Sequence, residues 1–202
     1  MTAKIFVDEQ TVIDESFRLG VQVYNSGFRP TFIVGLWRGG STVGIYLQEC
    51  LQTLGVTTDH IALRTSYAGR QAYESAVSDP QQPVSVHGTH YLIDALNRDD
   101  RLLLVDDVFA SGRTMAAVIE KLSERLKRNL PADIRIACLF RRDRAHRVGP
   151  TPDYVAHRTE DWVTLPYELN GLSATELDAH KPAFKRLVAT YGLTLPSLTE
   201  AT

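Results

Sequence analysis

The sequence of 202 residues has little of several features that mark particular classes of protein. Its two cysteines, Cys50 and Cys138, lie in segments with apolar periodicity, where a small buried thiol is more common than a disulfide or a metal ligand. The chain has 22 Lys and Arg against 24 Asp and Glu. A formal charge of −2 provides no field that would gather nucleic acid or an anionic membrane, so we expect neither as a partner.

The sequence also lacks patterns for targeting, for crossing a membrane and for binding zinc. The first ten residues, MTAKIFVDEQ, lack a basic region followed by an apolar stretch, and no apolar run approaches the roughly 20 residues that a bilayer requires. The six histidines are scattered, with only His87 and His90 three apart, so no zinc site is predicted. The sequence also lacks the G-x-x-x-x-G-K-[ST] and G-x-G-x-x-G patterns. We expect a cytoplasmic protein with a single domain over residues 1–202.

The hydrophobic pattern alternates between short apolar runs and helical periods. A helix is expected over residues 8–26, which open with Asp8 and close before Gly27. Buried strands are expected at 31–36, 60–64, 101–105, 133–140 and 153–157, and helices at 41–54, 89–98 and 112–129. This alternation predicts an α/β fold with a doubly wound, mostly parallel sheet, whose ligands bind beyond the carboxyl ends of the strands.

Two stretches interrupt the alternation. Residues 65–88 show no sustained period, and a loop of that length in a compact domain is usually a lid or a disordered segment. Residues 150–172 carry short β-like pieces and three prolines, which suggest a small flap beside the sheet. We therefore expect a core over about 28–145, a mobile loop over about 65–88, and a hood over about 146–172 followed by a C-terminal helix.

The segment LLLVDDVFASGRTMAAVIEKL, residues 102–122, carries the strongest chemical signal: a strand, two carboxylates, a turn of small residues and a helix. The start of a helix offers unpaired N–H groups and the positive end of its dipole, which together can hold a phosphate dianion. Ser and Thr hydroxyls add donors, and a glycine permits close approach of the backbone. The predicted phosphate-binding residues are Ala110, Ser111, Gly112, Arg113 and Thr114.

The two carboxylates are Asp106 and Asp107, at the end of the predicted strand. They lie a few residues from the phosphate turn, which suits acceptors for the 2′ and 3′ hydroxyls of a ribose 5-phosphate. They can also help to organise a hydrated Mg²⁺, which prefers few protein ligands and several oxygens from phosphate or water. The alternative is a buried strand with an N-capping turn whose aspartates face water.

At these residues the chain resembles the PRPP-binding signature of type I phosphoribosyltransferases. A second stretch, FIVGLWRGGSTVGIYLQECL, is similar to the pyrophosphate loop of that family, with Arg38, Gly39 and Gly40 in the turn. The resemblance implies that the Trp37–Arg38 peptide is cis or strained, so that N–H groups face the pyrophosphate. It also implies that Arg38, with the two aspartates, forms the catalytic set, and that Trp37, Gly39 and Gly40 contact substrate.

Further stretches resemble the purine branch of the family, the hypoxanthine-guanine and xanthine enzymes. The sequence TSY, which contains Ser66 and Tyr67, is similar to the Ser-Tyr element of their mobile loop. The stretch IRIACLFRRDRAHRVGPTPDYV is similar to the strand that ends in a base-reading lysine. That lysine corresponds to Arg142 here, a cation that can donate to the exocyclic oxygen of a 6-oxopurine.

The stretch DWVTLPYEL resembles the hood of bacterial xanthine phosphoribosyltransferases. By this resemblance Trp162 stacks on the purine, the Val163 backbone reads its edge, and Glu168 reaches the metal through water. A buried Trp is more often part of a core than a binding platform, but the neighbouring motifs favour the platform here.

The resemblance implies purine salvage: a purine base displaces pyrophosphate from PRPP in the presence of Mg²⁺ and yields a nucleoside monophosphate. It also implies a homo-oligomer, either a dimer or a tetramer. Two alternatives stay open, a regulatory protein of the same fold that binds PRPP or a nucleotide, and a phosphoribosyltransferase for adenine or a pyrimidine. Ala110 departs from the 6-oxopurine pattern, which usually has an Asp that handles the proton on N7, and adenine phosphoribosyltransferases carry Ala there.

Overall fold

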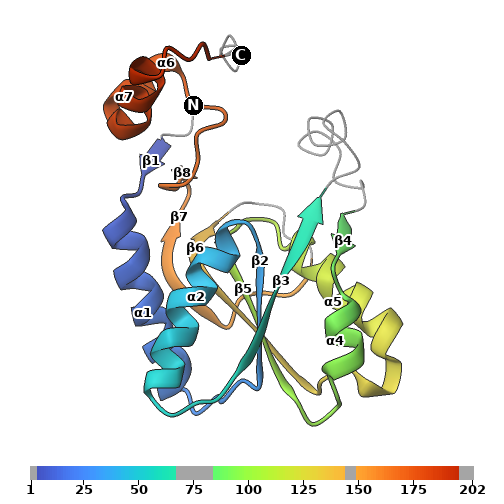
Figure 1. Ribbon diagram of the computed structural model, residues 1–202. Coiled ribbons are helices and arrows are strands. Elements are labelled where there is room, and N and C mark those ends of the chain that lie inside the picture. Colours follow the sequence, from blue (N-terminus) through green and yellow to red (C-terminus); the bar gives the residue numbers. More distant parts are fainter. Residues whose placement is uncertain (1–3, 67–83, 144–148, 196–202) are drawn as a thin grey trace.

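The computed structural model describes residues 4–66, 84–143 and 149–195, and a six-stranded sheet lies at its centre (Figure 1). The strand order is β4-β3-β2-β5-β6-β7, and every neighbouring pair is parallel except β3 with β4. The strands are β2 (Phe32–Trp37), β3 (Asp59–Ser66), β4 (Ser85–His87), β5 (Arg101–Phe109), β6 (Asp133–Arg142) and β7 (Tyr154–Thr159). This mostly parallel sheet confirms the predicted fold class.

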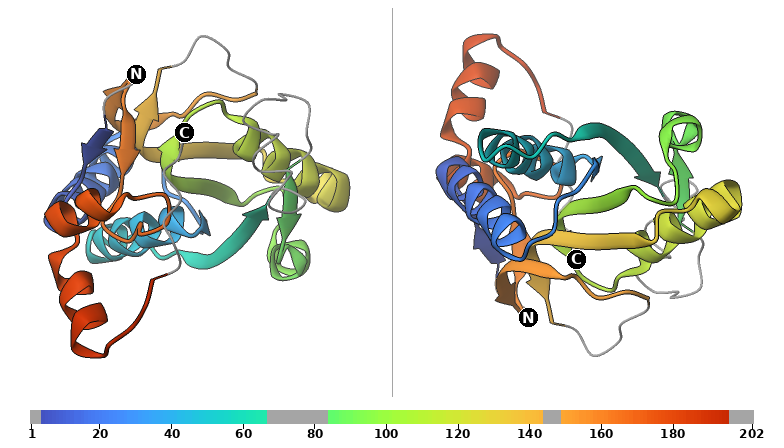
Figure 2. Two further views of the ribbon diagram at one scale, coloured as in Figure 1. Left: turned by 90° about the horizontal axis from the view of Figure 1, so that it is seen from above. Right: turned by 90° about the horizontal axis from the view of Figure 1, so that it is seen from below.

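Helices cover both faces of the sheet, as Figure 2 shows. The long helices α1 (Glu9–Asn25) and α2 (Gly39–Thr53) pack on one face, and α4 (His90–Ala95) and α5 (Arg113–Leu126) on the other, with a 3-10 turn at Lys127–Asn129. Successive side chains of β5 alternate between the two resulting cores, because the side-chain period of a strand is two. Leu103 and Val105 lie in the first core, and Leu102 and Leu104 in the second.

A second, two-stranded sheet lies beyond the carboxyl ends of the parallel strands (Figure 1). It pairs β1 (Lys4–Phe6) with β8 (Trp162–Thr164), and the short helices α6 (Ala174–His180) and α7 (Pro182–Thr190) follow. Contacts between the two ends of the chain hold this unit together, since Lys4 Nζ donates to Glu176 Oε1 at 2.7 Å. We call β1, β8, the turn after β8, α6 and α7 the hood.

The sequence pattern predicted the regular elements of the core and missed short elements that depend on pairing. The predicted helix over 8–26 and the five predicted strands are present. The predicted hood range of 146–172 needs correction, because β7 extends the main sheet and β8 alone lies in the small one. The predicted loop over 65–88 likewise begins with the end of β3 and contains β4, which is defined by its antiparallel pairing with β3. Most of that loop lies outside the described residues.

Local sequence determines where the helices begin. The Asp8 carboxylate accepts from Thr11 N at 2.8 Å, which caps α1. Gly112 has a φ of 84°, a left-handed conformation that glycine adopts at little cost, and this lets the chain turn from β5 into α5. In the hood, Ser173 and Glu176 form a reciprocal capping box at the start of α6. Among the described residues, no helix combines the length and hydropathy needed to cross a bilayer.

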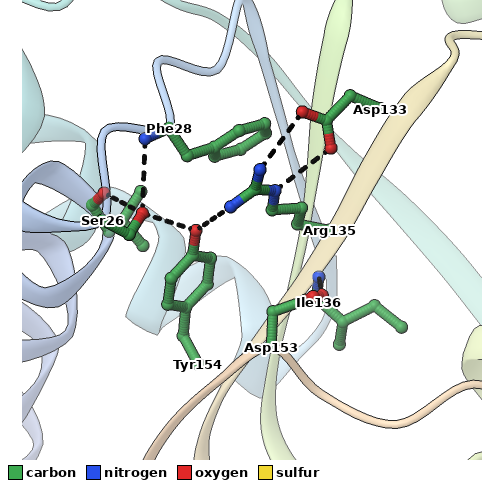
Figure 3. A network of polar contacts seen from close by, with 8 residues as sticks. Ser26, Phe28, Asp133, Arg135, Ile136, Asp153 and Tyr154 are labelled. Carbon is green, nitrogen blue, oxygen red and sulfur yellow. Dashed lines mark hydrogen bonds and ion pairs between the residues drawn. The ribbon is translucent and has the colours of Figure 1, made fainter.

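A polar network lies at the amino end of strands β6 and β7 (Figure 3). The Tyr154 hydroxyl lies 2.9 Å from Arg135 Nη1 and 2.7 Å from Ser26 Oγ, so it joins the end of α1 to β6 and β7. Arg135 also pairs with Asp133 and lies over the ring of Phe28, 4.4 Å from its centroid. The network therefore fixes α1 to the sheet at the far end from the predicted ligand site.

Replacing Tyr154 by Phe should lower the free energy of unfolding by about 1–2 kcal/mol, because the hydroxyl loses its hydrogen bonds to Ser26 and Arg135 while the ring is kept. Urea denaturation measures the change. Tyr24→Phe is the matched control, since the contact of Tyr24 with Arg29 uses the face of its ring. Equal stability of the Tyr154 variant and wild type would show that the network contributes nothing to the fold.

Candidate functional site

The two acids at the end of β5 lie next to each other and have different partners. Asp107 follows Val105 toward α2, and its Oδ2 accepts from the Tyr167 hydroxyl at 2.7 Å while its Oδ1 accepts from Val108 N at 2.8 Å. Asp106 stands beside Cys138 of β6 on the α5 face, and its Oδ1 accepts from Asp107 N at 3.1 Å. The two carboxylates are thus adjacent but differently held, and Asp107 is fixed by a side chain from the hood.

Their proximity and burial shape the electrostatics of this end of the sheet. Burial, and after it the charge of Asp107, raises the pKa of Asp106 well above its ordinary value. Burial and the charge of Asp107 also raise the pKa of Tyr167, so its hydroxyl keeps its proton and remains a donor. A cation bound beside these acids would therefore favour their ionised forms.

The predicted pyrophosphate turn lies directly against these acids. The Trp37–Arg38 peptide is cis, as the resemblance implies, and α2 begins immediately after it at Gly39. A Cβ on Gly39 would lie 1.6 Å from Asp107 Oδ2, and one on Gly40 would lie 2.3 Å from the carbonyl oxygen of Val105. Only glycine lets the start of α2 approach β5 this closely.

The predicted phosphate turn, Ala110 to Thr114, connects the end of β5 to the start of α5. Gly112, at the N-cap position of α5, has no side chain that could accept from the first turn of the helix. Arg113 N approaches Ser111 Oγ at 3.4 Å. The turn therefore places backbone N–H groups and two hydroxyls, from Ser111 and Thr114, at the start of α5.

The residues predicted to contact a base meet where β6 ends and β8 begins. Trp162 is 45% exposed, and the Arg142 guanidinium carbon lies 4.9 Å from its ring centroid. Arg142 itself is 4% exposed, and its Nε donates to the carbonyl oxygen of Asp161 at 2.9 Å. Val163 is buried and is paired with Ile5 of β1. The Trp162 ring is thus partly exposed, and the buried Arg142 guanidinium forms a cation–π contact with it.

A tight turn after β8 brings Glu168 toward the acids. Glu168 Oε2 accepts from Leu165 N at 3.1 Å, and Oε1 lies 4.0 Å from Arg38 Nη2. Burial, together with the charge of Asp107, raises the pKa of Glu168. Arg38 and Glu168 are thus brought together from segments 130 residues apart, which local sequence patterns cannot indicate.

The structure gathers most of the predicted site residues at one end of the sheet. Ser66 ends β3, at the same end, whereas Tyr67 lies outside the described residues. The sequence pattern did not indicate a role for Tyr167, although it lies within the stretch DWVTLPYEL that resembles the hood. Its contact with Asp107 depends on how the hood folds over the sheet, so the pattern alone could not reveal its role.

Comparison with known proteins gives this arrangement a context. A family model described as "Phosphoribosyl transferase domain" matches residues 3–170. The Bifunctional protein PyrR of Halalkalibacterium halodurans is 30% identical over 187 residues, which cover 87% of this chain and 97% of that protein.

Two solved structures share the fold. A purine phosphoribosyltransferase from Pyrococcus horikoshii is 23% identical, with a TM-score of 0.60 and coverage of 84% of this chain and 97% of the other. The xanthine-guanine-hypoxanthine phosphoribosyltransferase of Helicobacter pylori is 18% identical, with a TM-score of 0.60 and coverage of 88% and 100%. At these identities the two structures establish the fold alone.

Proposed function

The chain belongs to the phosphoribosyl transferase domain family and is a phosphoribosyltransferase of the type I fold, and from this premise we propose that its acceptor is a 6-oxopurine: hypoxanthine, guanine or xanthine. Enzymes of this family use PRPP and release pyrophosphate. The observation that carries the purine proposal is the exposed Trp162 ring over the buried Arg142 guanidinium. An aromatic face of this kind offers a stacking surface for a planar base.

The remaining residues suit the parts of PRPP. The turn from Ala110 to Thr114 holds the 5′-phosphate, Asp106 and Asp107 stand beside the ribose hydroxyls, and Arg38 with the start of α2 receives the pyrophosphate. The base attacks C1 of the ribose as pyrophosphate leaves, so the protein contributes positioning and stabilisation of the departing charge more than covalent chemistry. The Trp162 face then holds the base in line with that carbon.

The donor set fits Mg²⁺ bound together with substrate. Within the described residues, no group of three or more His, Cys, Asp or Glu side chains could hold a metal ion by itself. The carboxylates of Asp106, Asp107 and Glu168 nonetheless lie near the pyrophosphate turn, and burial, with a smaller contribution from the charge of Asp107, raises the pKa of Asp106 and of Glu168, an effect that a bound cation would oppose. Mg²⁺ typically takes one or two carboxylates and completes its shell with phosphate and water oxygens. When bound, it would offset the charge of the leaving pyrophosphate.

The test is release of pyrophosphate from PRPP and Mg²⁺ with hypoxanthine, guanine, xanthine, adenine, uracil or orotate as acceptor. We expect turnover with at least one 6-oxopurine and slow chemistry, because Ala110 removes the usual proton acceptor, and general base catalysis typically contributes about 10² to 10⁴ in rate. A preference for adenine or a pyrimidine would overturn the purine proposal. Tight binding of PRPP without transfer to any base would favour the alternative of a regulatory protein. The 30% identical relative is named a bifunctional protein, so this outcome is tested as well.

Replacing Trp162 by Ala should weaken binding of the nucleoside monophosphate by about 1–3 kcal/mol, the magnitude of base–aromatic stacking, and leave PRPP affinity unchanged. Isothermal titration calorimetry measures both ligands. Tyr191→Ala removes an aromatic side chain that is 71% exposed after α7, and it controls for the loss of a surface ring. Equal losses for PRPP and for the nucleotide would place Trp162 in the structural framework of the hood.

A further inference from the structure

The turn at Leu165–Glu168 is the point where the hood touches the acids. On its inner side the Tyr167 hydroxyl donates to Asp107 Oδ2 at 2.7 Å. On its outer side Lys181 Nζ donates to the carbonyl oxygens of Leu165, at 3.0 Å, and Pro166, at 2.7 Å. The turn is therefore held by polar contacts on both sides, and the outer contact comes from a part of the chain to which the sequence assigned no role.

Leu165 is buried in the core beneath α1 and α2, and Tyr167 packs against that core, but open grooves remain beside the turn. A groove of about 160 Å³ lies between Pro166, Tyr167, α1 and α2, and it is lined by Val12, Thr42 and Tyr46 among others. A second groove of about 490 Å³ lies between the turn, the start of α1 and the junction of α6 with α7. Where side chains lack close neighbours, directional hydrogen bonds decide position more than van der Waals contact does. The position of Tyr167 thus depends on its polar anchors as well as on its contact with the core.

Lys181 is itself well placed to serve as an anchor. It lies at the junction of α6 and α7, and Lys181 N donates to the carbonyl oxygen of Leu177, which is buried. The capping box of Ser173 and Glu176 and the ion pair of Glu176 with Lys4 fix α6 to β1. The ammonium therefore extends from a helix that is tied to the small sheet.

We propose that Lys181 is a positioning residue, which holds the hood turn so that Tyr167 and Glu168 remain at the acid pair. The turn transmits the effect, because Leu165 and Pro166 accept from Lys181 while the next two residues carry the side chains that meet Asp107 and Arg38. The two C-terminal helices thereby gain a role in assembling the site. This inference rests on the proposed function, since it assumes that the acid pair holds PRPP.

The experiment compares Lys181→Met, which keeps the length of the side chain and removes its donors, with Lys181→Arg, which keeps donors and charge. Lys185→Met is the matched control, because Lys185 lies on α7 and pairs with Asp178 at 3.0 Å, outside the turn. Two readouts are used for each variant. One is amide hydrogen exchange of residues 162–169, and the other is kcat and KM for PRPP with the preferred base.

Lys181→Met should speed exchange in residues 162–169 and lower kcat by roughly 10- to 100-fold, the size expected for a displacement of catalytic groups by about 1 Å. Lys181→Arg should restore most of both, and Lys185→Met should match wild type. Faster exchange with unchanged kcat would reduce Lys181 to a structural role, and unchanged exchange would overturn the inference. If wild type transfers to no base, the proposed function fails, and exchange together with the Kd for Mg-PRPP decides the role of Lys181.

Discussion

Replacing Gly39 by Ala should lower turnover by roughly 10²-fold or more while the protein stays folded, because reacting groups displaced by about 1 Å lose that much rate. The added Cβ would lie 1.6 Å from Asp107 Oδ2 and 2.3 Å from the Tyr167 hydroxyl. Both obstructing atoms are the ends of side chains, which can rotate away. The substitution therefore breaks the contact between the acid, the hood and the pyrophosphate turn without separating helix from sheet.

Two neighbouring glycines of α2 provide the comparison. A Cβ on Gly40 would meet backbone atoms of β5, the Val105 carbonyl oxygen at 2.3 Å and Asp106 Cα at 2.9 Å, which cannot rotate away. Gly40→Ala should therefore cost about 1–3 kcal/mol of stability or more. Gly44 has its nearest neighbour at 3.9 Å, so Gly44→Ala should be neutral or raise stability by about 0.5–1 kcal/mol.

Thermal unfolding and steady-state kinetics of the three variants separate these effects. The expected pattern is loss of turnover at normal stability for Gly39→Ala, loss of stability for Gly40→Ala, and neither loss for Gly44→Ala. Normal turnover in Gly39→Ala would show that Asp107 need not stay at the start of α2. The contact of Tyr167 with Asp107 would then have no part in the reaction.

The double substitution of Asp106 and Asp107 by Asn should weaken Mg-PRPP binding by roughly 10²- to 10⁴-fold. Each carboxylate that accepts from a ribose hydroxyl forms a charge-assisted hydrogen bond of about 1.5–3 kcal/mol, and the substitution removes both charges. The loss of two carboxylates near the metal adds to the effect. Calorimetry with Mg-PRPP measures the affinity directly, so the result does not depend on the identity of the base.

The fold should survive this change. Burial holds the pKa of Asp106 well above its ordinary value, which means that its ionised form is unfavourable in the folded protein, and a neutral amide removes that penalty. Asn at position 107 still offers an oxygen to the Tyr167 hydroxyl. Asp94→Asn with Asp99→Asn changes the net charge equally at two exposed positions and serves as the control. An unchanged Kd in the variant of the acid pair would contradict the assignment of the ribose site.

The predictions from local sequence succeeded where one short segment contains all the information. The helix over 8–26 was predicted from its period and from Asp8, and both agree with α1 and its cap. The acid pair, the phosphate turn and the Arg-Gly-Gly turn were each located within a single strand–turn–helix unit. Their meeting also followed from the sequence, because the carboxyl ends of parallel strands lie at one edge of the sheet.

The sequence by itself thus determined the fold class, the end of the sheet that carries the site, and the family whose motifs the site resembles. Tertiary structure alone decided that Tyr167 donates to Asp107, that Arg142 lies beneath Trp162, and that Lys181 holds the hood turn. Each of these contacts joins a side chain to a group of another segment, 60 residues away in the case of Tyr167 and Asp107. Local periodicity and turn chemistry report on neighbours along the chain, whereas these contacts depend on how β1 pairs with β8 and sets the hood over the sheet.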